Sequence, residues 1–171
     1  MAKARLLALA PVLLFLGCGY HTAGRAARLP LNLHVLAVPV FANQTQTYRV
    51  EQILTRDVVR EFIARTNYRV VTTSESADAV LHGTVLSAQA SPLTYDAQSG
   101  RISSAVVTVS MRISLVDRSG RVLFENQNYN FREQYQVTRE VNSFFEEETP
   151  ALLRMSREFA RTLVSDVLEG F

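Results

Sequence analysis

The sequence predicts an α+β fold: a two-layer sandwich in which two amphipathic helices pack on a mixed sheet of four to five strands. Three observations lead to this prediction. Apolar residues recur with the period of a helix in two segments, 48–66 and 149–170. They alternate with polar residues in 103–117, as in a strand with one buried face. The order of the elements is β-α-β-β-β-β-α, and a chain of 171 residues, 47% of them hydrophobic, can form one core of ordinary size.

The first 17 residues have the composition of a secretory signal peptide. Lys3 and Arg5 precede the uncharged stretch 6–16, which Gly17 separates from Cys18. A basic start, a short apolar run and a small residue before the cleavage point are typical of such a signal, whereas a membrane-spanning helix needs about 20 apolar residues. The expected divisions of the chain are a signal peptide that is removed (1–17), a lipidated tether (18–33) and a single α/β domain (34–171).

The chain's single cysteine, Cys18, stands at the position at which a bacterial lipobox is acylated. The alternative is an incidental cysteine behind a plain signal peptide, but the one cysteine lies where it would be modified, so we predict lipidation. One acyl chain gives only marginal membrane binding, and several chains give a firm anchor. The next residue is Gly19 rather than Asp, and by its resemblance to lipoprotein sorting in Gram-negative bacteria this favours the outer membrane.

The first half of the domain reads as strand, loop, helix and strand. The first strand is expected at 34–41, where Pro39 indicates an edge or a strand end because proline cannot donate to a ladder. A polar loop at 42–47 leads to a helix at 48–66, and the short strand 68–71 is expected to lie parallel to the first. The expected faces of the helix are an apolar stripe (Val50, Ile53, Leu54, Val58, Phe62, Ile63) and a charged side (Glu51, Arg56, Asp57, Arg60, Arg65).

The second half begins with a meander of three strands. The third strand is expected at 79–90, followed by a loop at 92–100 and a fourth strand at 103–117. The fourth strand has the clearest pattern, and its expected core-facing residues are Ala105, Val107, Val109, Met111, Ile113 and Leu115.

A tight hairpin loop at 117–121 leads to the fifth strand, 122–137. The alternation of its aromatic residues slips by one position, which predicts a bulge near 126–128. The fourth and fifth strands are about 14 to 16 residues long, against a usual five or six. Long strands need something that covers their edges and ends, so the pattern favours a binding partner.

The last helix is expected to begin with Thr149 as its N-cap and Pro150 as its first residue. The acidic run 146–148 would then precede it, where negative charge suits the helix dipole. Gly170 is expected to end the helix, and the expected apolar stripe consists of Leu152, Met155, Phe159, Leu163 and Val167.

The sequence contains no recognisable catalytic, metal or cofactor motif. His21, His34 and His82 are scattered, no acidic pair has metal-ligand spacing around them, and no Gly-rich phosphate loop or Gly-x-Ser-x-Gly motif occurs. One cysteine excludes a multi-cysteine zinc site. Removal of Lys3 and Arg5 from the 18 basic residues leaves as many basic as acidic residues, so the mature chain lacks the excess positive charge of a nucleic-acid binder. We expect neither an enzyme nor a nucleic-acid partner.

Arginine is the basic residue of the mature chain, which contains no lysine. Genomic composition bias explains this, but arginine also binds phosphate through two parallel hydrogen bonds. Ser-Gly-Arg occurs in two loops that flank the fourth strand and so lie at opposite ends of the sheet, ending in Arg101 and in Arg121. The two loops cannot hold one small anion together, and the sequence leaves open which of them contacts an anionic ligand.

Several short segments, in this order, resemble the LptE (RlpB) family of lipopolysaccharide-assembly lipoproteins, over nearly all of residues 18–168. The segments that carry the resemblance are Cys18-Gly19-Tyr20-His21, Val38-Pro39-Val40-Phe41-Ala42-Asn43-Gln44-Thr45, Leu54-Thr55-Arg56, Tyr68-Arg69-Val70-Val71, Ala77-Asp78-Ala79-Val80-Leu81-His82-Gly83-Thr84-Val85 and Tyr95-Asp96, together with the hairpin and the last helix.

This resemblance implies an outer-membrane lipoprotein, anchored by lipid at the periplasmic face. Members of the family sit as a plug inside the barrel of LptD, help that barrel to assemble, and contact lipopolysaccharide on its way to the outer leaflet. The partners implied are therefore LptD, lipopolysaccharide and the outer membrane, with no cofactor. The family's lipopolysaccharide contacts are attributed to basic residues, and Arg101 and Arg121 are the candidates in this sequence.

Two other functions remain open at this point. Another outer-membrane lipoprotein of similar α/β build, of the peptidoglycan-synthase activator or curli-secretion type, would also begin with an apolar strand, a Phe-x-Asn turn and a helix. The long fourth and fifth strands weigh against it. A periplasmic hydrolase would need a nucleophile and a base in one cleft.

Overall fold

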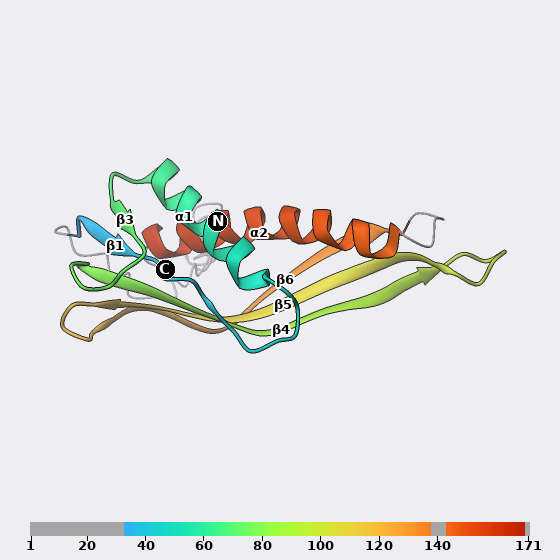
Figure 1. Cartoon of the computed structure of the whole chain (residues 1–171), viewed down its shortest axis with the longest axis horizontal. Helices are drawn as coiled ribbons and strands as arrows, with labels where there is room; N and C mark the ends of the chain where they lie inside the picture. The colour runs from blue at the N-terminus through green and yellow to red at the C-terminus, as the bar shows by residue number, and fades with distance from the viewer. Residues whose placement is uncertain (1–32, 138–142, 170–171) are drawn as a thin grey trace, which may run out of the picture.

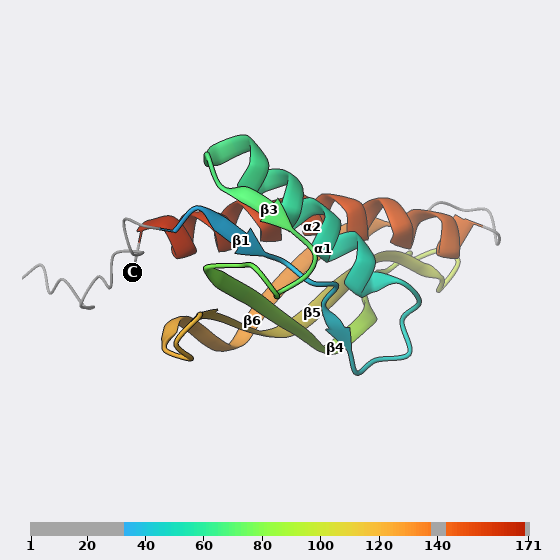
Figure 2. The ribbon, with the colours of Figure 1, turned by 60° about the vertical axis from the view of Figure 1, so that its left-hand side comes forward.

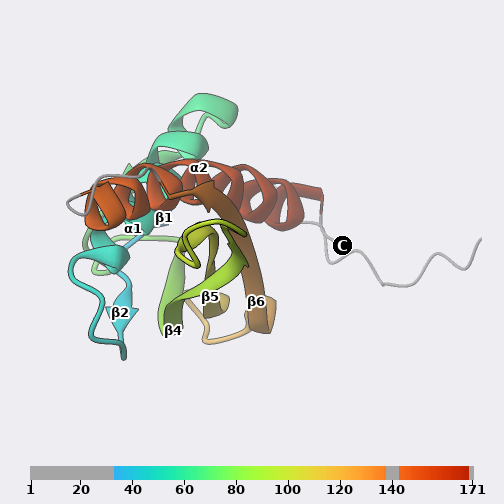
Figure 3. The same ribbon diagram turned by 90° about the vertical axis from the view of Figure 1, so that its right-hand side faces the viewer.

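The computed structural model describes residues 33–137 and 143–169, with the backbone alone for 143–149. The expected signal peptide, Cys18 and the expected tether up to residue 32 lie outside the described residues, as does Gly170. Two helices lie on one side of a long, twisted sheet, which confirms the predicted α+β sandwich (Figure 1, Figure 3). Leu33, the last residue of the expected tether, is buried in the core of this sandwich.

The described chain contains one strand more than the predicted order. The sheet has six strands in the order β3-β1-β4-β5-β6, with β2 paired to β4 beside this path. β1 and β3 are parallel, as predicted, and β4, β5 and β6 form the predicted antiparallel meander. The elements are β1 (Val35–Ala37), β2 (Ala42–Asn43), α1 (Val50–Arg65), β3 (Arg69–Val71), β4 (Ala79–Tyr95), β5 (Ile102–Asp117), β6 (Val122–Gln136) and α2 (Ser143–Glu169).

The prediction of one strand over 34–41 and a loop from 42 was wrong. β1 ends at Ala37, and the chain rejoins the sheet as β2, whose Ala42 pairs with Thr84 of β4. Pro39 explains the break, because it has no N–H to donate to a ladder. Since β1 lies between β3 and β4, this proline marks a strand end and not an edge. Phe41 packs over Gly83, where an added Cβ would lie 2.6 Å from its ring.

The predicted loop at 92–100 was also wrong at its start, because β4 continues through Pro92 to Tyr95. β2 pairs with β4 at Thr84 and Val85, and no strand in the described residues pairs with that edge farther along. A proline is tolerated there, since the missing N–H faces an open edge. The pairing with β5 shifts register between Val85 and Ser87 and again between Pro92 and Thr94.

β5 and β6 follow the predicted pattern. The six predicted core-facing residues of β5 are all buried, and Met111, near the middle of the strand, is fully buried. Met111 pairs with Tyr129 of β6, whereas Ile113 pairs with Asn126. Two residues of β6 therefore lie opposite Arg112, which confirms the predicted bulge.

α1 buries the predicted stripe of Val50, Leu54, Val58 and Phe62, but two of the predictions for this helix were wrong. Ile63, expected in the apolar stripe, is 60% exposed. Asp57, expected on the charged side, is only 4% exposed. The reason is that α2 packs beside α1, so the flank of α1 that carries Asp57 faces a second helix instead of water.

α2 begins at Ser143, so the predicted start at Thr149–Pro150 was wrong. Glutamate has a high helix propensity, and the helix includes the acidic run 146–148 that was expected to precede it. Pro150 lies inside the helix, where it is exposed and removes one backbone hydrogen bond. The five residues of the predicted apolar stripe are all buried, and Phe159 packs edge-on against Tyr129 and Phe131 of β6.

Candidate binding site at the hairpin turns

The two Ser-Gly-Arg loops form the turns at opposite ends of the sheet, as the sequence predicts. The β4–β5 turn projects at one end of the molecule and the β5–β6 turn lies at the other (Figure 1). Figure 2 brings the β5–β6 turn forward together with β1, which lies at the same end. The described structure therefore separates Arg101 from Arg121 and does not bring them into one site.

Both turns have a similar internal construction, although the β4–β5 turn has one residue more between its aspartate and its serine. In the β5–β6 turn, Asp117 Oδ1 accepts hydrogen bonds from the backbone N–H of Ser119 at 2.8 Å and from its hydroxyl at 2.6 Å. In the β4–β5 turn, Asp96 Oδ1 accepts the corresponding bonds from Ser99, both at 2.7 Å. Each turn then has a glycine with positive φ, 67° at Gly100 and 85° at Gly120. Such a backbone conformation favours glycine.

The guanidinium of Arg121 is held by its own turn. Its Nε lies 3.2 Å from Asp117 Oδ2, and its backbone N–H donates to Asp117 Oδ1 at 3.0 Å. The hydrogen bond from the Ser119 hydroxyl lowers the pKa of Asp117 more than burial raises it, and the backbone bonds and the Arg121 charge lower it further. Asp117 therefore stays ionised, and its charge occupies Arg121.

The same end of the sheet is tied to β1 through Asp78. One oxygen of Asp78 accepts hydrogen bonds from the backbone N–H groups of His34 and Val35, both at 2.9 Å. Arg118 pairs with the other oxygen at 3.3 Å and donates to the carbonyl of Ala77 at 3.2 Å. The backbone bonds from His34 and Val35 lower the pKa of Asp78, with a smaller contribution from Arg118.

We call this end of the sheet, where Asp117 holds Arg121 and Asp78 ties the turn to β1, the clamped end. A cavity of about 270 Å³ lies there. Leu33, where the described chain begins, contributes to its wall. The two arginines in the wall are both paired with carboxylates, which leaves little positive charge for an anionic ligand. The residues that line the cavity are Leu33, Asp78, Asp117, Arg118, Ser119, Arg121 and Leu123.

Arg101 at the β4–β5 turn is in a different state. It is exposed, and among the residues whose side chains are described, 33–137 and 150–169, no carboxylate forms an ion pair with it. The neighbouring strand ends carry two exposed large apolar side chains, Leu93 (50%) and Tyr95 (61%). Tyr95 pairs with Ile102, the residue after Arg101. Cationic and apolar groups therefore lie together at this tip.

The sequence did not identify Leu93 and Tyr95 as candidate site residues, because both fell in a segment predicted as a loop. Once β4 is extended to Tyr95, their positions on a projecting hairpin become clear. The signal in the sequence is an uncharged stretch, Ser87–Tyr95, that contains these two side chains immediately before the turn.

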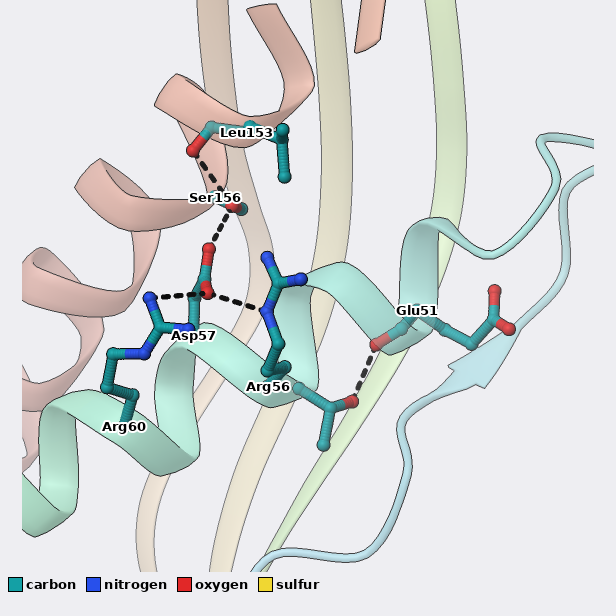
Figure 4. Close-up of polar contacts among 7 residues, drawn as sticks. Glu51, Arg56, Asp57, Arg60, Leu153 and Ser156 are labelled. Atoms are coloured by element: carbon teal, nitrogen blue, oxygen red, sulfur yellow. Dashed lines mark hydrogen bonds and ion pairs between the residues drawn. The ribbon is translucent and has the colours of Figure 1, made fainter. Parts of the chain in front are cut away.

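The buried polar contact between the helices is structural and not catalytic (Figure 4). Asp57 Oδ1 lies 3.0 Å from Arg56 Nε and 3.6 Å from an Arg60 nitrogen, while its other oxygen accepts a hydrogen bond from the Ser156 hydroxyl. Burial raises the pKa of Asp57, but the hydrogen bonds from Arg56 and Ser156 and the charges of Arg56 and Arg60 outweigh it, and the net pKa is lowered. Ser156 is 0% exposed and cannot reach a substrate.

The described residues show neither a hydrolytic centre at this pair nor a metal-binding cluster. Neither His34 nor His82 takes part in the Asp57–Ser156 contact, so a hydrolase would lack its base at this pair. No group of three or more His, Cys, Asp or Glu residues in the described segments could hold a metal ion. Neither described helix is long and apolar enough to cross a membrane.

The face of the sheet that points away from the helices is polar and carries little charge. The residues of β4, β5 and β6 on this face alternate with the buried ones, and most of them have hydroxyl or amide side chains, although Val80, Val106 and Val116 lie among them. Arg112 and Arg132 are exposed there, and Glu125 is the acidic residue of the same face. The hydroxyl and amide residues are Thr84, Ser87, Gln89, Thr108, Ser110, Ser114, Asn130 and Gln134.

Solved structures with the same fold include several lipoproteins. Lipoprotein B of Nitrosomonas europaea is 16% identical, with a TM-score of 0.55 over 87% of this chain and 90% of that chain. A minor lipoprotein of Acinetobacter baumannii is 15% identical, with a TM-score of 0.51 over 81% and 93%. A hypothetical protein of Chlamydia trachomatis is 9% identical, with a TM-score of 0.55 over 80% and 97%. At these identities the likeness shows the fold alone.

Sequence comparison gives the family. No curated protein sequence matches the chain. The model of one family, LptE, described as lipopolysaccharide-assembly, matches residues 33–167, which is most of the chain and includes every described strand and nearly all of α2. The chain belongs to the LptE family of lipopolysaccharide assembly.

Proposed function

We propose that this protein is an outer-membrane lipoprotein, anchored at the periplasmic face through acylated Cys18, that plugs the LptD β-barrel, helps it to assemble and binds lipopolysaccharide during delivery to the outer leaflet. The observation that carries the proposal is the family match over residues 33–167. In this function the domain is a scaffold and binding module without catalytic activity. The buried contact of Asp57 with Ser156 then serves to hold α1 on α2.

Arg101 is the residue we assign to lipopolysaccharide, and the assignment rests on the contrast between the two turns. A guanidinium without an internal partner can offer its forked donors to a phosphate. Arg101 has no ion pair in the described chain, whereas Arg121 is held by Asp117. Use of Arg121 would first require its separation from Asp117, so we assign it a structural role.

The open face of the sheet supports the proposed position inside a barrel. The interior of a large transmembrane β-barrel is polar, and the hydroxyl and amide side chains of this face match such a surface. β4 has 17 residues, which at ~3.3 Å each is longer than the hydrocarbon core of ~30 Å. The chain enters the domain at the clamped end, so the β4–β5 turn lies at the end farther from the anchor.

The partner is tested by extraction of the native outer membrane with mild detergent, capture through a C-terminal tag, and mass spectrometry of the proteins recovered. A large β-barrel protein recovered in a 1:1 ratio is the expected result. Recovery of the tagged protein alone, or with a peptidoglycan synthase, would contradict the plug and favour an activator-type lipoprotein. The matched control is Cys18→Ala, which is expected to give a folded protein that is released from the membrane.

The ligand is tested by titration of purified protein with lipopolysaccharide in detergent. Arg101→Ala is expected to weaken binding by about tenfold or more, because a charge-assisted hydrogen bond to phosphate is lost. Arg121→Ala is the control and is expected to leave the affinity unchanged. Equal losses in the two variants would contradict the assignment to one end of the sheet.

A further inference from the structure

Past Ala88, part of the helix-facing side of the sheet has no helix above it. Ala88, Ala90 and Pro92 of β4 pair with Val109, Val107 and Ala105 of β5. Residues directly opposite in an antiparallel pair lie on the same face, and these three β5 residues are buried beneath the helices. Ala90 and Pro92 are nevertheless exposed.

The positions of the helices explain this exposure. α1 begins at Val50, and the hydroxyl of Thr47, just before it, contacts the carbonyl of Ala88 at 3.4 Å. α2 lies over β6, to which Arg154 is joined by an ion pair with Glu133 at 2.7 Å. The end of β4 therefore extends beyond α1 and to one side of α2, and Figure 1 shows the β4–β5 hairpin projecting past α1 and the described part of α2.

We define the β4 shelf as Ala88, Ala90 and Pro92 on this side of the sheet, together with Leu93 and Tyr95, the two exposed apolar side chains between Pro92 and the turn. No charged residue occurs from Ser87 to Tyr95. Leu93 and Tyr95 are half exposed or more, and Ala88 and Ala90 have small side chains that leave the strip shallow and smooth. Arg101, without an ion pair in the described residues, lies at the end of the strip, across the turn from Tyr95. An apolar strip that ends at one cation complements an anionic amphiphile.

A peptide strand is a poor occupant for this strip. Pairing with the open edge of β4 would need regular backbone donors, and Pro92 has none. The register shifts at Val85/Ser87 and Pro92/Thr94 also bend the edge. Proline and bulges are the usual means by which an exposed edge avoids pairing with another strand.

We propose that the β4 shelf holds an acyl chain of an anionic lipid whose phosphate is bound by Arg101. The proposal rests on the proposed function, since it divides the lipopolysaccharide site into a phosphate subsite at the turn and an acyl subsite along β4. Binding buries Leu93 and Tyr95, which are otherwise exposed to water. The driving force is then hydrophobic along β4 and electrostatic at Arg101.

The test compares two probes on the full-length protein in detergent-free buffer, in the Cys18→Ala background so that the protein's own acyl chains do not compete. One probe is the phosphorylated disaccharide of lipopolysaccharide with its acyl chains, used below its micelle concentration. The other is the same disaccharide after the chains are removed. Ala90→Glu and Leu93→Ser are expected to weaken binding of the acylated probe by about tenfold and to leave the deacylated probe unchanged. Arg101→Ala is expected to weaken both.

Val40→Ser is the matched control, because Val40 is a 62% exposed apolar residue outside the shelf and its loss should change neither affinity. Circular dichroism and thermal unfolding check that each variant keeps its fold. If Ala90→Glu and Leu93→Ser bind the acylated probe like the parent while Arg101→Ala does not, the acyl subsite is overturned and the phosphate assignment stands. If the parent binds neither probe, the lipopolysaccharide function is overturned together with the shelf.

Discussion

The two hairpin turns at the ends of β5 share a Ser-Gly-Arg tripeptide and an aspartate that caps it, but they differ in length by one residue and in the contacts of their arginines. Each has an aspartate that caps a Ser-Gly-Arg tripeptide and a glycine with positive φ. At the β5–β6 turn, Asp117 holds Arg121, and Arg118 joins the turn to Asp78. At the β4–β5 turn, Arg101 has no ion pair within the described residues. The same tripeptide is thus a structural clamp at one end and an accessible cation at the other.

The difference teaches that a short motif acquires part of its role from residues that are distant in sequence, because Asp117 holds Arg121 within the turn but Arg118 joins the turn to Asp78. Arg118 and Asp78 are 40 positions apart, and Asp78 binds the N–H groups of His34 and Val35, more than 40 positions earlier. These contacts exist because β1 lies beside the start of β4. In the described residues no strand lies beside β4 near the β4–β5 turn, because β4 extends past β1 and β2, so this turn has no equivalent of the Asp78–Arg118 pair.

The largest effect is expected from the strand that both turns share. Met111→Asp places a charge in the core at the middle of β5, where Met111 is fully buried, and costs on the order of 4–5 kcal/mol, enough to unfold a domain of ordinary stability. Arg112→Asp, one residue along on the exposed face, is expected to change stability by about 0.5 kcal/mol or less. Urea unfolding of both variants measures the contrast, and a stable Met111→Asp would show that the facing of β5 is wrong.

The next largest effect on stability should differ between the two ends of the sheet. Asp78→Ala removes the acceptor for two backbone N–H groups of β1 and the partner of Arg118, so we expect the melting temperature to fall by several degrees. Asp96→Ala removes the hydrogen bonds within the β4–β5 turn and should lower it less. Thermal unfolding by circular dichroism compares them. An equal fall would mean that the clamp does not distinguish the two turns.

Acid should loosen the clamped end. The pKa values of Asp78 and Asp117 are lowered from the usual 3.8, so the stability that they contribute is complete above about pH 3.8 and is lost as the pH falls through their lower folded values. Amide exchange in β1 and in the β5–β6 turn should therefore rise below pH 3.8, and Asp78→Asn should reduce this pH dependence. Asp166, whose pKa is raised by burial and by Glu169, should respond in the opposite sense.

Periodicity predicted the elements whose environment is set locally. The alternation in β5 and the stripes of both helices needed only the spacing of apolar residues, and all of the stripe positions except Ile63 and the partly buried Ile53 are buried. The errors arose where a neighbour distant in sequence decides. Asp57 is buried because α2 lies beside α1, and Pro92 is tolerated because no strand pairs with that edge of β4.

For the same reason, the sequence predicted the arginines of the candidate site but not the apolar residues beside Arg101. The Ser-Gly-Arg repeat and its position on either side of β5 identified Arg101 and Arg121 and placed them at opposite ends. The repeat could not rank them, because the spacing to the preceding aspartate differs: Asp117 lies four positions before Arg121 and pairs with it, whereas Asp96 lies five positions before Arg101. Leu93 and Tyr95 were missed because the strand was predicted to end before Pro92.

The smallest effect is expected from substitution of the glycines in the two turns, and it should be equal at both ends of the sheet. Gly100 and Gly120 have positive φ and nothing within 4 Å of an added Cβ, so Gly→Ala at either position strains the backbone without a steric clash. We expect each substitution to cost about 1–2 kcal/mol, and Gly→Asn to cost less, because asparagine tolerates this conformation better. Denaturant unfolding of the four single variants measures this. A clearly larger cost at Gly120 would mean that the clamp around Arg121 also depends on the path of its own turn, so that the two ends differ in backbone as well as in contacts.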